Sequence, residues 1–283
     1  EGLNLYEIML DNEMAITGAS RTSILEGLNN ILDRMEESVR HGLAGSGYLA
    51  GPLKVERKAH MLLERAHALH SSPGKFLAGL NAYAFAASEE NASGGVIVTA
   101  PTCGSAGVMP SLVYAMRHDL FIGDRAIREG FLAAAAVGFI AKHNASIAGA
   151  EVGCQGEIGV ASAMTAAGLA QLGGGTPEQV IHAAAIALKN LLGLICDPVA
   201  GPVEIPCIKR NAVGVSNAFA AADMALAGIP SRIPPDEVVD ALINVQGLLH
   251  PDLRGNLRGG LASTATGRAL KDEWYARMKR MQA

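Results

Sequence analysis

The chain has 283 residues and a formal net charge of −4, and aromatic residues make up only 4% of it. Basic residues neither outnumber acidic ones nor cluster with aromatic residues, so there is no case for nucleic-acid binding. The longest apolar run, residues 131–141, is about half of the roughly 20 residues that a membrane-spanning helix requires, which argues against membrane insertion.

The N-terminal stretch "EGLNLYEIML" has neither a basic start nor a small-residue cleavage site, so no signal peptide is expected. Four cysteines are present, but a chain this long and alanine-rich does not depend on disulfides for its stability. We therefore expect a cytoplasmic protein whose cysteines are free thiols or thiolates on a metal.

Abundant alanine and leucine, with little β-branched alternation, predict an all-α fold. The first predicted helix starts at Ser23, because Ser23 and Glu26 have the spacing of a capping box, and it ends near Gly42. Further helices are expected over residues 55–70, 74–92, 124–147, 176–192, 212–226 and 235–246.

Two of these helical stretches consist largely of alanine and glycine, namely "GFLAAAAVGFIAKHNASIAGA" and "GVASAMTAAGLAQLGGG". Such small residues let helix backbones approach closely, so we expect both at the centre of the molecule. The short apolar run "GGVIVTAP" is expected to be extended without indicating a sheet. No linker or internal repeat divides the chain, which predicts a single compact multi-helix domain over residues 1–283.

The four cysteines lie beside glycine or proline and not on helix faces: Cys103, Cys154, Cys196 and Cys207. A single intracellular cysteine is usually an inert buried thiol. Turns beside Gly and Pro, however, free backbone amides that can hydrogen-bond to thiolate sulfur. No C-x-x-C pair is present, so the spacing leaves open a zinc site with three cysteines and His143, or a four-iron cluster with one iron lacking a protein ligand.

Four segments strongly resemble the alpha chain of the iron–sulfur-dependent L-serine dehydratases: "NASGGVIVTAPTCGSAGVMP", "GAEVGCQGEIGVASAMTAAGL", "CDPVAGPVEIPCIKRNAV" and "GGLASTATGRALKDE". The resemblance covers nearly the whole chain. It implies an all-helical catalytic domain and conversion of L-serine to pyruvate and ammonia. It also implies an oxygen-sensitive [4Fe–4S] cluster held by Cys154, Cys196 and Cys207, whose open iron acts as a Lewis acid toward the serine hydroxyl.

The sequence departs from the single-chain members of that family in two ways. It lacks their regulatory region, which implies a separate beta chain as partner, and we expect an oligomer. It also lacks the C-terminal cysteine with which some members cap the cluster. Cys103 could supply a fourth thiolate, but a closed cluster would block catalysis, so Cys103 is assigned to the substrate pocket.

A substrate carboxylate needs hydrogen-bond donors, and "TAPTCGSAGVMP" offers a turn at a predicted helix start. Its candidate substrate-binding residues are Thr102, Cys103, Gly104, Ser105 and Gly107. On sequence alone, an ordinary capped helix after a proline turn is as good an interpretation.

His143 is the predicted catalytic base, because it precedes the Cys154 loop and histidine is the residue type most often used as a general base. A hydrogen-bonded core histidine, or a base supplied by the beta chain, are the alternatives. The other candidates are Glu151 as a catalytic residue that meets the substrate ammonium, and Asn144, Ser146, Arg210 and Asn211 as substrate-binding residues. Glu157 is expected to be merely exposed.

The sequence leaves two other functions open. A cluster-dependent cysteine desulfidase would use the same site with sulfur as the leaving atom. A non-enzymatic helical scaffold would have inert or zinc-bound thiols.

Overall fold

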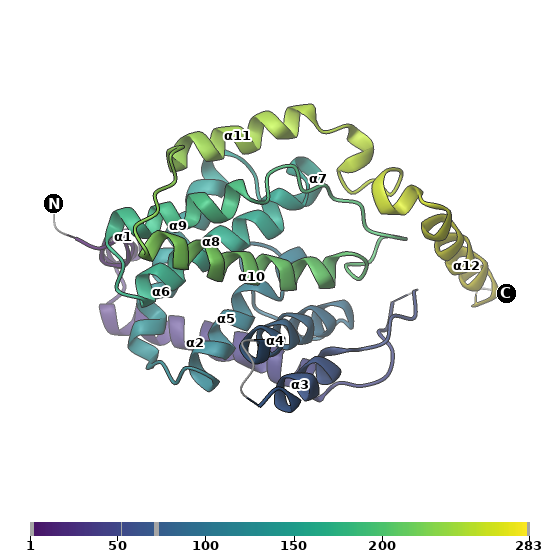
Figure 1. Ribbon diagram of the computed structural model, residues 1–283, viewed down its shortest axis with the longest axis horizontal. Coiled ribbons are helices and arrows are strands. Elements are labelled where there is room, and N and C mark those ends of the chain that lie inside the picture. Colours follow the sequence, from purple (N-terminus) through teal and green to yellow (C-terminus); the bar gives the residue numbers. More distant parts are fainter. Residues whose placement is uncertain (1–2, 52, 71–73, 282–283) are drawn as a thin grey trace.

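The computed structural model describes residues 3–51, 53–70 and 74–281 (Figure 1). These residues form helices and loops without a β-strand, apart from two isolated bridges, so the predicted all-α fold is confirmed. The helices are α1 (Leu5–Thr17), α2 (Arg21–Ala44), α3 (Ala59–Ala68), α4 (Gly74–Ala92), α5 (Val108–His118), α6 (Asp124–Asn144), α7 (Gly149–Val152), α8 (Val160–Leu172), α9 (Pro177–Lys189), α10 (Cys207–Leu226), α11 (Pro235–Leu248) and α12 (Ala265–Met281).

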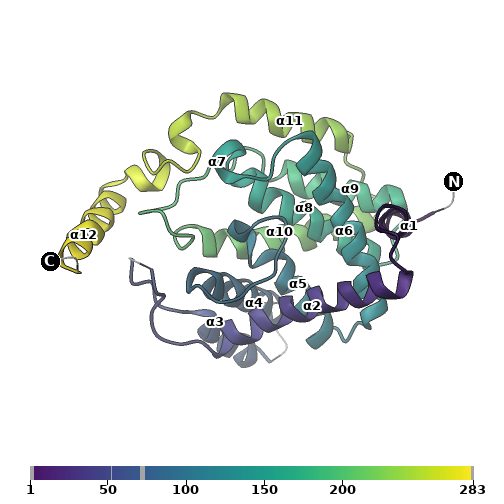
Figure 2. The same cartoon turned by 180° about the vertical axis from the view of Figure 1, so that it is seen from behind.

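Helix α8 lies in the middle of the molecule, between α6, α9 and α10, and both views show this arrangement (Figures 1 and 2). Every residue from Val160 to Ala170 is buried. Close packing with α6 depends on glycine, because a Cβ at Gly130 would lie 2.9 Å from the carbonyl oxygen of Gly168, and one at Gly168 would lie 3.0 Å from that of Gly130. The prediction of central Ala/Gly-rich helices is therefore confirmed.

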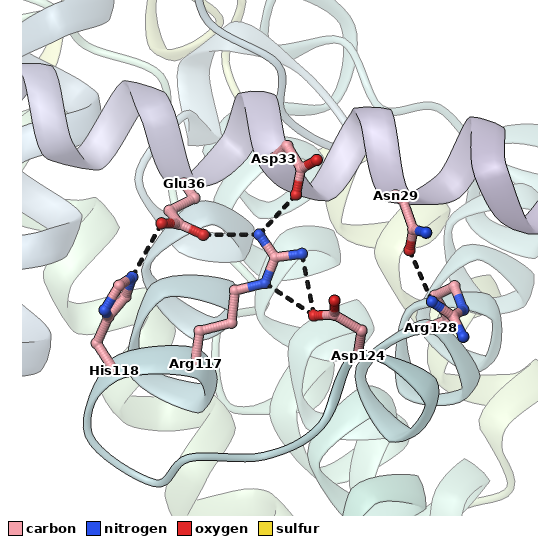
Figure 3. Close-up of polar contacts among 7 residues, drawn as sticks. All are labelled: Asn29, Asp33, Glu36, Arg117, His118, Asp124 and Arg128. Atoms are coloured by element: carbon pink, nitrogen blue, oxygen red, sulfur yellow. Dashed lines mark hydrogen bonds and ion pairs between the residues drawn. The ribbon is translucent and has the colours of Figure 1, made fainter.

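Helix α2 is joined to α5 and α6 by a charged network around Arg117 (Figure 3). The Arg117 guanidinium lies 2.9 Å from Asp33 and 2.6 Å from Glu36 on α2, and 3.1 Å from Asp124 at the start of α6. His118 adds a 3.0 Å contact to the other oxygen of Glu36. Arg117 is largely buried, so this network fixes three helices more firmly than an exposed ion pair would.

Several predicted helix boundaries are wrong. Helix α2 begins at Arg21, and its cap is Ser20, whose hydroxyl accepts a hydrogen bond from the amide of Ser23. Helix α6 ends at Asn144, and α10 begins at Cys207, one turn earlier than expected. Helices α1 and α12 were not anticipated, and α12 extends away from the rest of the molecule in both views.

Residues 95–99 form neither helix nor strand, as the sequence predicted for this stretch. Among the described helices, none combines the length and the apolar character that crossing a bilayer requires.

Candidate active site

The sulfur atoms of two cysteines and a carboxylate oxygen of one glutamate lie close together where the chain passes from α7 to α8. One ligand atom each from Cys154, Glu157 and Cys196 lies within 4.8 Å of the others. Cys207 is buried at the first residue of α10, close enough to Cys154 for the charges of the two groups to interact. Cys154 and Cys196, from segments far apart in the sequence, thus form with Glu157 a group that could hold a metal, and this group does not include Cys207.

Cys154 lies in a backbone deformation between α7 and α8. Gly153 before it has φ +80°, and residues Gln155–Gly159 form a π-helical turn. Cys154 is only 3% exposed, although the residues next to it, Gly153 and Gln155, give it no apolar cover in the sequence. The burial comes from packing against segments that the local sequence does not contain, because its core cluster includes residues of α4, α5 and α10.

Gln155 joins the Cys154 turn to the loop that leads to Cys196. Its backbone amide donates to Leu194 O at 2.9 Å, and its side-chain oxygen accepts from the Gly193 amide at 2.9 Å. The side-chain amide donates to Leu242 O of α11 at 3.3 Å. A fully buried glutamine with these partners fixes the spacing between the two cysteine-bearing segments.

Cys196 lies in an extended segment that pairs with residues 253–255. Its amide donates to Leu253 O at 2.9 Å, and its carbonyl accepts from the Gly255 amide at 2.6 Å. Two glycines leave room around its sulfur, because a Cβ at Gly149 would lie 3.4 Å and one at Gly255 3.3 Å from Cys196 Sγ. Gly255 also has φ +79°, a conformation that favours glycine.

The thiols share one cationic neighbour, Arg210. Its guanidinium lies 3.7 Å from Cys154 Sγ, donates to Ile195 O at 2.9 Å and pairs with Asp197 at 2.8 Å. Hydrogen bonding with Cys196 and burial raise the pKa of the Cys154 thiol, and burial together with the nearby Cys154 raises the pKa of Cys207 to about 12. Without a metal, these two thiols are therefore protonated at neutral pH.

At this site, the burial of Glu157 differs most from what the sequence predicted. The sequence predicted an exposed residue, but it is half-buried, and burial raises the pKa of its carboxyl group. The hydroxyl of Thr102 donates to Glu157 Oε1 at 2.8 Å. A Cβ at either Gly104 or Gly149 would collide with the carboxylate, so these two backbones form its walls.

The predicted carboxylate-binding turn lies directly beside Glu157. Ser105 is buried and donates to Thr102 O at 2.9 Å, and Gly107 is buried at the start of α5. Cys103 is exposed, and its carbonyl accepts from the side chain of Asn91 at 3.0 Å. All five candidate residues of the turn therefore lie within one compact segment next to the thiols.

Asn211 holds this turn against α10. Its side-chain oxygen accepts from the Gly107 amide at 2.8 Å, and its side-chain nitrogen donates to Gly104 O at 3.0 Å and to Cys207 O at 2.9 Å. Asn211 is only 1% exposed, and its side-chain amide forms all these hydrogen bonds with backbone groups. The structure thus links the turn to a cysteine segment through a residue predicted to bind substrate.

The remaining candidates lie between α6 and α7. Ser146 donates a hydrogen bond to Glu151, and its hydroxyl accepts from the Ala148 amide at 3.1 Å. His143 and Asn144 are exposed at the end of α6, and no hydrogen bond or ion pair among the described residues joins them to the cysteines. Of this region, Gly149 is the residue that approaches Glu157 and Cys196.

Sequence reasoning missed Gln155, Glu157 and Asp197. Asp197 is buried beside Cys196, where it pairs with Arg210 and accepts from the Leu261 amide at 2.8 Å. The signal available for all three was their position within three residues of a candidate ligand cysteine.

A family model and several known proteins match this chain over most of its length. Residues 1–262 match the family model described as "Serine dehydratase alpha chain". The chain is 44% identical over 274 residues to the "Probable L-serine dehydratase, alpha chain" of Bacillus subtilis (strain 168), covering 96% of this chain and 90% of that protein. It is 41% identical over 273 residues to the "L-serine dehydratase, alpha chain" of Peptoniphilus asaccharolyticus, covering 96% and 93%.

A third relative is longer. The "L-serine dehydratase TdcG" of Escherichia coli (strain K12) is 44% identical over 266 residues, which are 92% of this chain but 58% of that protein. This chain therefore spans little more than half of that relative.

Proposed function

The chain belongs to the serine dehydratase alpha-chain family, and on this premise we propose that it converts L-serine to pyruvate and ammonia together with a separate beta chain. The names of two relatives of similar length contain "alpha chain", which supports a partner subunit. Residues 1–283 would act as one catalytic domain, since Phe219 packs against both core clusters.

The observation that carries this proposal is the close approach of Cys154 and Cys196, whose sulfur atoms lie within 4.8 Å of each other. Cys207 lies within electrostatic range of Cys154, and the absent Cβ atoms of Gly149 and Gly255 leave space at Cys196. The nearby Arg210 offsets the negative charge that bound thiolates would carry. These residues fit a [4Fe–4S] cluster held by three thiolates.

Such a cluster, when bound, supplies Lewis acidity toward the hydroxyl that leaves the substrate. The chain's own residues bind and orient the amino acid. Within the described residues, the amides of Cys103 and Gly104 have no hydrogen-bond partner, so the turn can donate to the substrate carboxylate. Asn211 holds that turn in place, and Thr102 orients the Glu157 carboxylate beside it.

Removal of the α-proton requires a base. His143 is the candidate on this chain, with Glu151 and Ser146 near it on the α6–α7 border and Asn144 beside it. Its exposed position makes a beta-chain residue the second source of this base. The substitution His143→Gln, assayed with the beta chain present, separates the two: a loss of kcat supports His143, and an unchanged kcat assigns the base to the beta chain.

The proposal is tested on protein prepared without oxygen and mixed with its beta chain. Four iron atoms and four labile sulfides per alpha chain, together with formation of pyruvate from L-serine, support it. Cys154→Ser, Cys196→Ser and Cys207→Ser should each lower the iron content. One zinc or no metal would favour the scaffold function, and faster release of sulfide from L-cysteine than of pyruvate from L-serine would favour a desulfidase.

A further inference from the structure

Glu157 is a half-buried carboxylate without a cation. No arginine, lysine or histidine nitrogen among the described residues lies within 4.0 Å of its oxygens, and the one nearby guanidinium, that of Arg210, pairs with Asp197. The hydrogen bond from Thr102 satisfies Oε1 only. A buried negative charge in this position is costly unless a bound partner supplies the opposite charge.

The Glu157 carboxylate lies next to both parts of the proposed substrate site, the turn and the thiols. It touches the backbone of Gly104, which belongs to the turn with free amides, and it shares a 4.8 Å neighbourhood with the sulfur atoms of Cys154 and Cys196. A ligand that bridges the turn and the thiols therefore passes directly over Glu157.

An α-amino acid has the matching arrangement of charges. Its carboxylate and its ammonium group are attached to the same carbon, so their binding groups must also adjoin each other. The Cys103–Gly104 amides and the Glu157 carboxylate meet at Gly104, and the hydroxyl-bearing carbon would then point toward the cysteines. The sign of each group is complementary to that of the amino acid.

We propose that Glu157 binds the α-ammonium group of the substrate and thereby makes the site selective for amino acids over hydroxy acids, an inference that rests on the proposed function. Glu151, the residue assigned to the ammonium from the sequence, is exposed and shares a hydrogen bond with Ser146. Glu157 is the better binding group because it is the carboxylate that adjoins both the turn and the thiols. Thr102 is its positioning residue.

The test uses anaerobic enzyme reconstituted with its beta chain, and compares wild type with Glu157→Gln. Glutamine has the same shape and still accepts the Thr102 hydrogen bond, so only the charge is removed. Binding is measured by calorimetry for L-alanine, which has the ammonium group, and for 3-hydroxypropionate, which lacks it. KM for L-serine and the iron content are measured on the same samples.

We expect Glu157→Gln to weaken L-alanine binding and to raise KM for L-serine by roughly 10- to 100-fold. Binding of 3-hydroxypropionate should change by no more than about twofold, since that ligand makes no contact through an ammonium group. Glu157→Asp should give intermediate values, and the exposed Glu64→Gln should match wild type.

An equal loss of affinity for both ligands would overturn the proposal. So would a fall in iron content in Glu157→Gln, because Glu157 would then be a metal ligand. If wild type forms no pyruvate but binds L-alanine, the proposed function fails while the calorimetric comparison still decides the role of Glu157. Wild type that binds neither ligand overturns both.

Discussion

The guanidinium of Arg210 lies 2.8 Å from the carboxylate of Asp197, and this ion pair joins the start of α10 to the segment that carries Cys196. The same guanidinium donates to Ile195 O at 2.9 Å and lies 3.7 Å from Cys154 Sγ. One side chain thus contacts two cysteine-bearing segments while it sits three residues after the third cysteine, Cys207.

Replacing Arg210 by methionine should destabilise the protein by about 3–5 kcal/mol, because Asp197 would remain as a buried charge without its cation. The measurement is the free energy of unfolding from urea titration of the metal-free protein. Arg125→Met is the matched control, since Arg125 is exposed and its pair with Glu129 lies within one helix. A change of about 0.5 kcal/mol or less in both variants would contradict the structural role of the ion pair.

Asn211→Leu removes a side chain that contacts three backbone groups while keeping a similar volume. We expect a loss of about 2–3 kcal/mol in unfolding free energy, because the Gly107 amide and two carbonyl groups lose their partner. KM for L-serine should rise, since the 102–107 turn loses its anchor on α10. The exposed Asn12→Leu is the control, and equal KM values in both variants would show that Asn211 does not position the turn.

The helical class could be predicted from the sequence because it depends on composition and periodicity, which are local. The buried centre formed by α6 and α8 could also be predicted, since runs of alanine and glycine have few uses other than close helix packing. Helix starts were less predictable. The cap of α2 is Ser20 and not Ser23, and the choice between two nearby serines depends on where the chain turns.

The cysteines beside glycine and proline, together with the family resemblance, predicted which segments form the site, but not their geometry. Cys154 and Cys196 approach each other only because the segments that carry them pack together, and no spacing rule contains that information. Glu157 was misjudged for the same reason. Its neighbours in the sequence, Gly156 and Ile158, give no sign that it is removed from solvent, whereas the residue that orients it, Thr102, is 55 positions away.

Gly130→Ala should destabilise the protein by about 1–3 kcal/mol, although alanine is the better helix former. Its Cβ would lie 2.9 Å from Gly168 O and from a side-chain carbon of Leu172, so α6 and α8 would have to separate. Gly27→Ala is the matched control, because a Cβ at that position of α2 meets nothing within 4 Å. Gly27→Ala should stabilise by about 0.5–1 kcal/mol. Thermal and urea unfolding measure both, and the same sign for both variants would contradict the close approach of the two helices.

Glu36 makes part of the folding stability depend on pH in the acidic range. Burial alone would raise the pKa of this carboxyl group, but hydrogen bonds and charge interactions with Arg117 and His118 outweigh it and lower the pKa below its usual 4.5. A carboxyl group whose pKa is lower in the folded state than in the unfolded state stabilises the fold above pH 4.5. That contribution is lost as the pH falls through the lower, folded-state pKa.

Glu36→Gln should therefore be less stable than wild type at neutral pH, by about 1 kcal/mol for a partly exposed network. The difference should shrink as the pH is lowered, because wild type loses the contribution of the charged carboxylate and glutamine has none to lose. Urea unfolding at a series of pH values between about 6 and 3 measures this convergence. Glu26→Gln, on the exposed face of the same helix, should run parallel to wild type at every pH. A Glu36→Gln curve that is also parallel would mean that the Arg117 network does not act through the charge of Glu36.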